Sequence, residues 1–479
     1  MSLIKFFTHR RRSIFTAGTD AVRADTWRPA VELWPAAAWS LTAAAALSMT
    51  LTAMTPPVPA LPMGLAAGVL GTLRLRSALG VLKDRAALAG SALELISSRS
   101  FARRLLRARR DMAGKGNNET FAPVWFGRGF DWGPEHAQKL YELSKIDVNR
   151  LLPARALCKL LTGTEPKDSR TVGLSAIDGL ESRKKDIWVS EKTLEGGTLI
   201  VGTTQAGKGV LLTSLVTQAI LRGESVIVID PKMSSRLQNA VTAAAKLAHR
   251  SPPLFFHPNH PEELRINPLT HFERPSEIAS RITAVMSDSG PFTSFAWSAV
   301  NVVVDLLVHV GQTPSIAAIE SVLTGDFEDL LLEAAELDCG EDYFDMLVSE
   351  AKVKGKKGRE GVLDVLDRAR AEERLSEATL KGAATYAHDP VHFSKITASL
   401  MPVLAMLTSG ALRQTLSPRD DDPLAMSLSE IIAQRKILYV CLNSLPDPTV
   451  AGAIGSMLLA DLASCAGVRT CAGYPGSYD

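Results

Sequence analysis

Residues 198–230 contain the pattern that most narrowly constrains the fold of this chain. The β-favouring triplet 199–201 leads into a glycine-containing loop, 202–208, after which apolar residues recur at helical spacing as far as Gly223. A second β-favouring run, 225–229, ends at Asp230. Strand, loop, helix and strand in this order predict a parallel α/β sheet, because the helix returns the chain to the edge where the first strand began.

The loop itself has the spacing of a phosphate-binding loop, with glycine and lysine in a GxxxxGK pattern between a strand and a helix. Its glycines let backbone N–H groups turn inward around phosphates, and its lysine adds a mobile positive charge. A glycine-rich turn with a purely structural role is the alternative. The predicted cofactors are ATP and Mg²⁺, and the predicted nucleotide-binding residues are Gly202, Thr203, Thr204, Gln205, Ala206, Gly207, Lys208, Gly209 and Val210, with Lys208 as the catalytic residue.

Gly209 occupies the position where such loops normally carry the serine or threonine that holds Mg²⁺. A water molecule or another loop residue must replace that hydroxyl, or the affinity for the metal falls. The segment VIVIDP resembles the acidic strand of such ATPases, yet no glutamate follows Asp230. Asp230 and Lys232 are therefore secondary candidates near the phosphates, and no residue is predicted as a protein ligand of a metal.

Two apolar segments near the N-terminus predict a membrane hairpin. Residues 33–54 carry no charge, and a helix of this length covers about 33 Å, enough for the hydrocarbon core of a bilayer. A proline-rich break over 55–62 precedes a second, shorter span at about 58–75. A cleaved signal peptide or a buried soluble hairpin are the alternatives.

The charges around these spans predict their orientation. Arginine and lysine flank the hairpin on both sides, whereas the connecting turn contains neither. The positive-inside rule then places both termini in the cytoplasm and the connecting turn outside. Residues 1–115 hold 17 Lys and Arg against 6 Asp and Glu, and six cations fall within 101–115. That segment is predicted to contact anionic lipid or DNA, or to form a solvated helix face.

From about 272 to 430 the alternation of strands and helices gives way to helical patterns. The run KILYVCLNSL at 436–445 then predicts a strand that returns to the sheet, and AGAIGSMLLADLAS predicts a helix that packs on it. The chain has five cysteines without paired spacing, which is typical of free thiols in a reducing compartment.

The order of these features resembles the TraD/TraG-type coupling proteins of conjugative type IV secretion systems, in particular those of integrating conjugative elements. The resemblance rests on the membrane hairpin and on WFGRGFDW with HAQKLY, GTTQAGKG, VIVIDPK, INPL, SFAWSAVN, KITASLMPVL and ILYVCLNSL. It implies a RecA-like P-loop ATPase domain with an inserted all-α domain, assembled as a homo-hexamer at the bacterial inner membrane. It also implies ATP-driven movement of relaxase-linked single-stranded DNA to the components of the secretion channel.

One departure from the family lies at the end of the chain. Members continue into a strand that ends in Asp-Glu, whereas this chain ends in AGVRTCAGYPGSYD. We therefore expect a truncated product that binds ATP weakly and hydrolyses little of it. The alternatives are a membrane-anchored nucleotide-binding fragment without hydrolysis and an FtsK-like DNA translocase.

The predicted domain organisation follows from these patterns. The expected segments are a cytoplasmic N-terminus with the transmembrane hairpin (1–80), a juxtamembrane linker (81–190), the first part of the nucleotide-binding domain (191–271), the all-α insertion (272–430) and the return strand and helix (431–479).

Overall fold

The computed structural model describes most of the chain in segments. The described residues are 27, 29–52, 57–90, 100–101, 103–105, 107, 123–163, 175–181, 184–203, 206–286, 291–388 and 397–471. They form a mixed α/β structure that is mostly helical, with one two-stranded and one three-stranded sheet. The chain divides into two compact units, an N-terminal unit (residues 1–215) and a C-terminal unit (residues 216–479).

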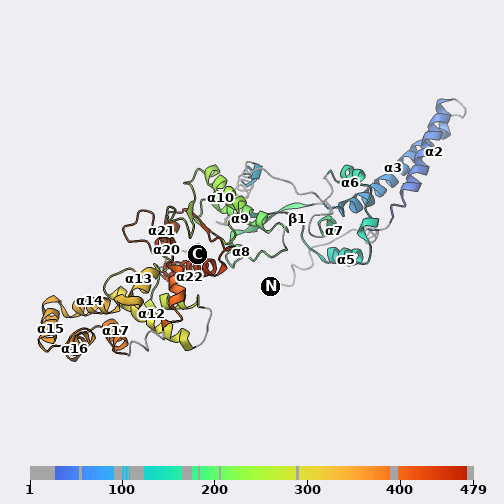
Figure 1. The fold of residues 1–479 in the computed structure, drawn as a ribbon. Helices are drawn as coiled ribbons and strands as arrows, with labels where there is room; N and C mark the ends of the chain where they lie inside the picture. The colour runs from blue at the N-terminus through green and yellow to red at the C-terminus, as the bar shows by residue number, and fades with distance from the viewer. Residues whose placement is uncertain are drawn as a thin grey trace, which may run out of the picture. The chain divides into compact units, whose positions relative to one another are not determined.

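The two predicted membrane spans are both helical. Helix α2 (Leu33–Leu51) and helix α3 (Pro57–Ala87) lie side by side in the N-terminal unit (Figure 1). Among the described residues, two helices are long and apolar enough to cross a membrane by length and composition, Ala60–Ala87 and Pro448–Val468. Helix α2 is not one of these two, since alanine, serine and threonine make up most of it.

The start of α3 differs from the predicted proline-rich break over 55–62. The helix begins at Pro57 and includes Pro59 and Pro62. Pro57 and Pro59 lie in the first helical turn, where the missing N–H would have had no intrahelical acceptor, whereas Pro62 lies inside the helix and removes one backbone hydrogen bond without ending it. Helix α3 also continues beyond the predicted end at residue 75, through Arg74 and Arg76, as far as Ala87.

Small residues bring α2 and α3 close together. A Cβ atom added at Gly71 would lie 3.0 Å from the Oγ atom and 3.3 Å from the backbone nitrogen of Ser40. A Cβ added at Gly68 would lie 3.9 Å from that of Ala43. Because apolar helices in lipid associate through close packing at small residues, these glycines account for the approach of the two backbones.

The remainder of the N-terminal unit contains a small antiparallel sheet and short helices. Strand β1 (Pro123–Gly129) pairs with β2 (Lys185–Ser190), and a bulge falls between Trp125 and Gly127, whose φ of 134° suits glycine. Strand β1 contains the first five residues of WFGRGFDW, and helix α5 contains HAQKLY. The helices are α5 (Pro134–Leu143), η1 (Val148–Arg150), α6 (Arg155–Thr162), α7 (Ser175–Gly179) and α8 (Glu191–Leu194).

Most of the basic segment 101–115 lies outside the described residues. Of its arginines, Arg104 stacks over the ring of Trp125 at 5.4 Å and lies 3.6 Å from the carboxylate of Asp186. The side chain of Arg104 therefore makes contacts within the chain, where it packs against the β1–β2 sheet.

The C-terminal unit is built on a three-stranded parallel sheet. Its strands are β3 (Val226–Asp230), β5 (Ile437–Cys441) and β4 (Leu254–Phe256), in the order β3-β5-β4. The strand that comes last in the sequence therefore lies in the middle, with Val226 opposite Ile437 on one side. The predicted return strand at 436–445 is confirmed.

Helices cover both faces of this sheet. Alternate residues of β5 point to opposite sides, so that Tyr439 packs with α9 (Lys208–Arg222) and α10 (Ser235–Leu247), and Val440 packs with α22 (Pro448–Cys471). All five residues of β5 are buried, as expected for a central parallel strand. Helix α22 was predicted over 451–464, but it extends to Cys471 and includes part of the predicted tail.

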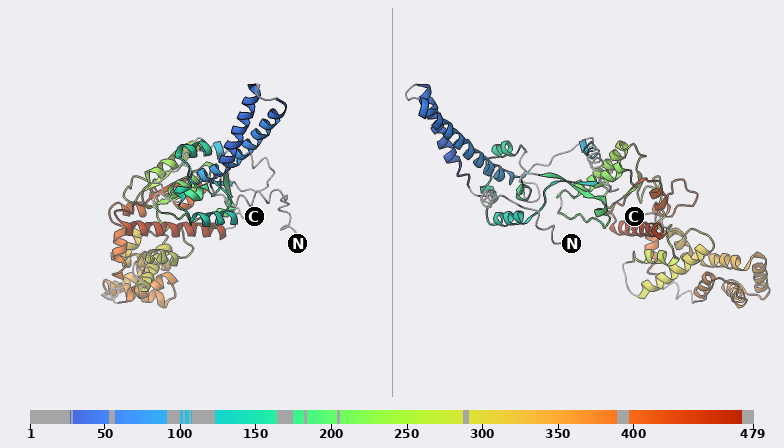
Figure 2. Two further views of the ribbon diagram at one scale, coloured as in Figure 1. Left: turned by 90° about the vertical axis from the view of Figure 1, so that its right-hand side faces the viewer. Right: turned by 180° about the vertical axis from the view of Figure 1, so that it is seen from behind.

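The region between β4 and β5 is helical, as predicted for 272–430. Its long helix α12 (Pro291–His309) contains the segment SFAWSAVN, and Figure 2 shows the helices that surround it. One continuous apolar core joins this region to the α22 face of the sheet. The elements are α11 (Pro275–Thr283), α12 (Pro291–His309), α13 (Ile316–Ser321), the π-helical turn η2 (Val322–Asp326), α14 (Phe327–Cys339), α15 (Glu341–Val353), α16 (Arg359–Ala371), α17 (Glu377–Ala387), α19 (Met401–Leu407), α20 (Leu412–Leu416) and α21 (Leu428–Ala433).

Replacing Gly71 with leucine is expected to separate α2 from α3, because overpacking at a backbone contact costs about 1–3 kcal/mol. The approach of the helices can be measured as oxidative cross-linking of a cysteine pair, Ala43→Cys with Gly68→Cys, in full-length protein whose native cysteines are replaced by serine. Slower cross-linking is expected for Gly71→Leu. Gly80→Leu serves as the control, since a Cβ at Gly80 meets nothing within 4 Å, and equal rates in both variants would contradict the small-residue contact.

Candidate functional site

The predicted phosphate loop lies directly before a helix, as expected. Helix α9 begins at Lys208 and runs to Arg222 without interruption. Thr204 and Gln205 lie outside the described residues, and the other predicted loop residues are described. The first N–H groups of a helix have no intrahelical acceptors, so those of Lys208 and Gly209, at the first two positions of α9, are available to an anion.

The prediction of a strand before the loop is wrong for the structure as described. Residues 197–201 form neither strand nor helix, and no described strand pairs with them. The side chains of Leu199 and Val201 are 89% and 80% exposed. A short apolar run becomes a strand only where a neighbouring strand supplies hydrogen-bond partners, and β propensity alone does not provide them.

The described loop residues fold around the Lys208 side chain. Its ammonium group donates to the carbonyl oxygens of Gly202 and Thr203, at 2.5 and 2.7 Å. A Cβ added at Gly202 would lie 3.2 Å from that of Ala206, and Gly207 has a φ of 92° that suits glycine. The two glycines thus allow a tight turn that holds a mobile cation at the start of a helix.

Gly209 and Val210 complete the predicted loop within the first turn of α9. A Cβ added at Gly209 would meet nothing within 4 Å, so the position has room for a side chain. The nearby hydroxyl of Thr213 donates to the Gly209 carbonyl oxygen at 2.6 Å. Val210 is half exposed and donates its N–H to the carbonyl oxygen of Gly207 at 3.0 Å.

Asp230 ends β3 and lies buried in the C-terminal unit. Its carboxylate accepts hydrogen bonds from the backbone N–H groups of Lys232 (3.0 Å) and Ser234 (2.6 Å), and from the hydroxyl of Tyr439 (2.5 Å). Burial and this last hydrogen bond raise the pKa of Tyr439 well above its usual value, so that the phenol remains a donor. Asp230 therefore stabilises the turn from β3 into α10, whereas the side chain of Lys232 is exposed.

The segments that follow β3 and β5 are joined at the carboxyl edge of the sheet. The N–H of Leu442 donates to Asp230 O at 3.1 Å, and that of Ser444 donates to Pro231 O at 2.7 Å. The chain then leaves β3 towards α10 on one face and leaves β5 towards α22 on the other. In parallel sheets, ligands bind at the carboxyl edge where successive connections diverge in this way.

A cavity of about 360 Å³ opens beside this edge, between the segments after β4 and β5 and the start of α22. Its lining includes Asn259, Ser409, Asn443 and Asp447. Asn443 has a φ of 49°, an uncommon backbone conformation for a residue other than glycine. The sequence interpretation missed this cavity, because it forms only when β5 takes the central place in the sheet.

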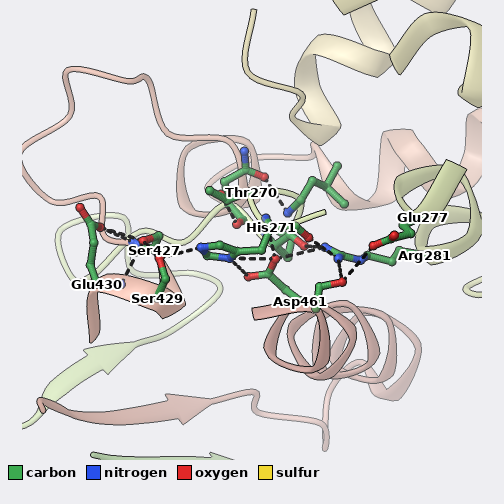
Figure 3. Close-up of polar contacts among 12 residues, drawn as sticks. Thr270, His271, Glu277, Arg281, Ser427, Ser429, Glu430 and Asp461 are labelled. Atoms are coloured by element: carbon green, nitrogen blue, oxygen red, sulfur yellow. Dashed lines mark hydrogen bonds and ion pairs between the residues drawn. The ribbon is translucent and has the colours of Figure 1, made fainter. Parts of the chain in front are cut away.

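A buried ionic network fixes the far part of α22 (Figure 3). Asp461 has no exposed surface, and its carboxylate lies 3.1 Å from the guanidinium of Arg281 and 3.1 Å from His271 Nδ1. His271 Nε2 lies 2.7 Å from the hydroxyl of Ser429, and Arg281 donates to Ser464 Oγ at 2.7 Å. The network joins α22 to α11, to α21 and to the segment after β4.

Ser429, His271 and Asp461 lie in the order hydroxyl, imidazole and carboxylate that hydrolases use. Arg281, however, donates to the other carboxylate oxygen of Asp461 at 3.1 Å and neutralises its charge. The arrangement therefore fits a structural role, the anchoring of an apolar helix. The sequence interpretation missed it, although a lone aspartate within GSMLLADLAS was a signal for a buried partner.

No protein-family model, curated protein or solved structure matches this chain.

Replacing Asp461 with alanine is expected to destabilise the protein by about 3–5 kcal/mol, because Arg281 would remain buried without its carboxylate. Urea unfolding followed by circular dichroism measures this cost. The control is Ser429→Ala, which removes one neutral hydrogen bond at the other end of the network and should cost about 1 kcal/mol. Similar costs for the two variants would contradict the central role of Asp461.

Proposed function

We propose that this chain is an ATP-binding coupling protein of a conjugative type IV secretion system, of the TraD/TraG type. In this proposal a RecA-like P-loop domain is anchored in the bacterial inner membrane by the α2–α3 hairpin. It binds ATP with Mg²⁺ and moves relaxase-linked single-stranded DNA to the secretion channel. The observation that carries the proposal is the loop Gly202–Val210 at the start of α9, in a chain whose last strand returns to the centre of a parallel sheet.

The topology of the C-terminal unit supports this proposal. Strands β3 and β4 precede the helical region, and β5 enters the sheet between them after that region. A helical domain inserted in this way leaves one sheet intact and adds an all-α domain that shares its core. The TraD/TraG family implies the same arrangement of a motor domain and an all-α domain.

The residues of the loop fit a triphosphate. Lys208 is a cation on a flexible side chain, held by two carbonyl oxygens that a phosphate can replace. The first turn of α9 offers backbone N–H groups, and Mg²⁺ would supply further charge to the phosphate oxygens. Gly209 contributes no hydroxyl to that metal, so binding rests on the lysine and on the backbone.

The localisation and the partners complete the proposal. The apolar helix Ala60–Ala87, only 17% buried, supports a membrane anchor. Both termini would then lie in the cytoplasm, where DNA, the relaxase and the channel components are available. A homo-hexamer would enclose the translocated strand.

A second candidate is a membrane-anchored nucleotide-binding protein without hydrolysis. Among the three described parallel strands, only β3 ends in an acidic residue, Asp230. Its carboxylate already accepts three hydrogen bonds, from Tyr439 and from the turn before α10. Within the described residues, no strand therefore presents a carboxylate pair to organise Mg²⁺ and activate water.

Replacing Lys208 with alanine is expected to weaken ATP binding at least about tenfold, since it removes a charge-assisted contact to phosphate of about 1.5–3 kcal/mol. Titration of the full-length protein in detergent with a fluorescent ATP analogue measures this change. Lys192→Ala is the matched control, because Lys192 is an exposed lysine on α8. Unchanged affinity in Lys208→Ala would refute the phosphate loop, and rapid DNA-stimulated hydrolysis by the wild-type chain would refute the second candidate.

Replacing Gly209 with serine is expected to strengthen Mg²⁺-dependent ATP binding, because the serine hydroxyl would occupy the usual metal-binding position. A Cβ atom at this position meets nothing within 4 Å, so there is room for the side chain. Serine and alanine both have a higher helix propensity than glycine, so Gly209→Ala is the control. ATP titrations with and without Mg²⁺ should show a gain in the serine variant that disappears without the metal. Equal gains in both variants would mean that only helix propensity changed.

A further inference from the structure

A small cavity lies within the helical region of the C-terminal unit, and it shares no lining residue with the cavity beside the sheet edge. Its volume is about 180 Å³, and its wall includes the π-helical turn η2 (Val322–Asp326). Single π-helical turns are rare and occur frequently at functional sites. The aromatic and basic residues of the wall are Phe327, Arg359, Tyr386 and His388.

Three of these side chains form a stack. The rings of Phe327 and Tyr386 are nearly parallel, with an interplanar angle of 7° and centroids 6.3 Å apart. The guanidinium of Arg359 lies over the Tyr386 ring, 5.0 Å from its centroid. Planar groups from α14, α16 and α17 are thus aligned along one wall of the cavity.

Hydrogen bonds hold this stack in place. Arg359 donates to the backbone carbonyl oxygens of Tyr386 and His388, and the hydroxyl of Tyr386 donates to the carboxylate of Glu328. Burial and this hydrogen bond raise the pKa of Tyr386 to about 12, so the ring stays neutral. The cavity is therefore pre-organised, with its planar faces fixed before any ligand binds.

The size and chemistry of the cavity suit one planar ring. Drug-sized ligands occupy about 300–1,000 Å³, whereas this cavity is smaller. Proteins bind single-stranded nucleic acid by stacking bases on aromatic and arginine side chains beside a positively charged track. Such a track adjoins this wall, because the basic segment KVKGKKGR, 352–359, ends at Arg359.

The charges place the sugar–phosphate backbone on one side of the cavity. Lys354 and Lys357 are exposed, while Lys356 pairs with Asp364 at 2.7 Å. Glu328 accepts a hydrogen bond from the Tyr386 hydroxyl and Asp326 directly precedes Phe327, and these carboxylates disfavour a phosphate next to the aromatic rings. A strand would therefore run along 352–359 and turn one base towards Phe327.

We propose that this cavity binds one nucleobase of single-stranded DNA, with Phe327, Tyr386 and Arg359 as its stacking wall and the 352–359 segment as its phosphate contact. This inference rests on the proposed function in one respect, the presence of single-stranded DNA as a ligand. It adds a specific contact that neither the phosphate loop nor the family resemblance assigns.

The test compares Phe327→Leu, which keeps apolar volume and removes the aromatic face, with Phe327→Trp, which restores a face. Fluorescence anisotropy with a labelled oligothymidylate and the full-length protein in detergent should show about 5- to 150-fold weaker binding for Phe327→Leu, the range for loss of one base stack. Phe327→Trp should bind like the wild type. The control is Tyr343→Leu, because Tyr343 stacks with Arg374 at 4.0 Å in the same helical region and does not line this cavity.

Two further measurements separate the possible outcomes. Phe327→Leu should leave the salt dependence of binding unchanged, whereas Lys354→Ala with Lys357→Ala should lower the salt slope. Wild-type protein should also prefer oligothymidylate to an abasic strand of equal length. Unchanged affinity in Phe327→Leu, or equal binding of the abasic strand, overturns the proposal. Both results are expected if the cavity instead binds an aromatic side chain of a partner protein.

Failure of the proposed function has a different signature. A wild-type chain that binds no single-stranded DNA overturns both the DNA part of the proposed function and this inference. A chain that binds DNA with equal affinity in the wild type and in Phe327→Leu overturns the inference alone. ATP titration of the same variants tests the Lys208 loop independently of both.

Discussion

The C-terminal unit depends on β5 as the centre of its sheet. Ile437–Cys441 supplies backbone hydrogen bonds to β3 on one side and to β4 on the other, and its side chains are buried on both faces. Without this strand, β3 and β4 would have no partner, since their separation leaves room for one strand between them. Because β5 lies far along the chain, the elements from α11 to α21 connect β4 to a strand that lies beside it in the sheet.

Helix α22 connects the sheet to the helical region. It packs on one face of the sheet through residues such as Ile454 and Leu458, and its buried Asp461 pairs with Arg281 of α11. Composition alone makes this helix a candidate for a membrane span. A buried carboxylate paired with arginine and histidine indicates instead a core helix, half buried within its own unit.

Local sequence patterns predicted some elements well. The β-favouring runs at 225–229 and 436–445 and the helix after GTTQAGKG appear where expected, because each depends mainly on short-range sequence patterns. The predicted strand over 199–201 does not form, since it needed a partner that the local pattern cannot supply. Within the predicted break at 55–62, residues 57–62 are helical, because Pro57 and Pro59 are harmless in the first turn of α3 and Pro62 removes only one hydrogen bond.

The sequence by itself determined the loop with Lys208, the parallel character of the sheet and the apolar hairpin, because glycine conformation, strand and helix periodicity and charge distribution are local properties. Only the tertiary structure decided that β5 is central, that Asp230 is engaged by Tyr439 and that Asp461 meets Arg281. It alone also brought Phe327, Arg359 and Tyr386 together. These contacts join residues far apart in the chain, and their energies come from burial and pairing that no local pattern encodes.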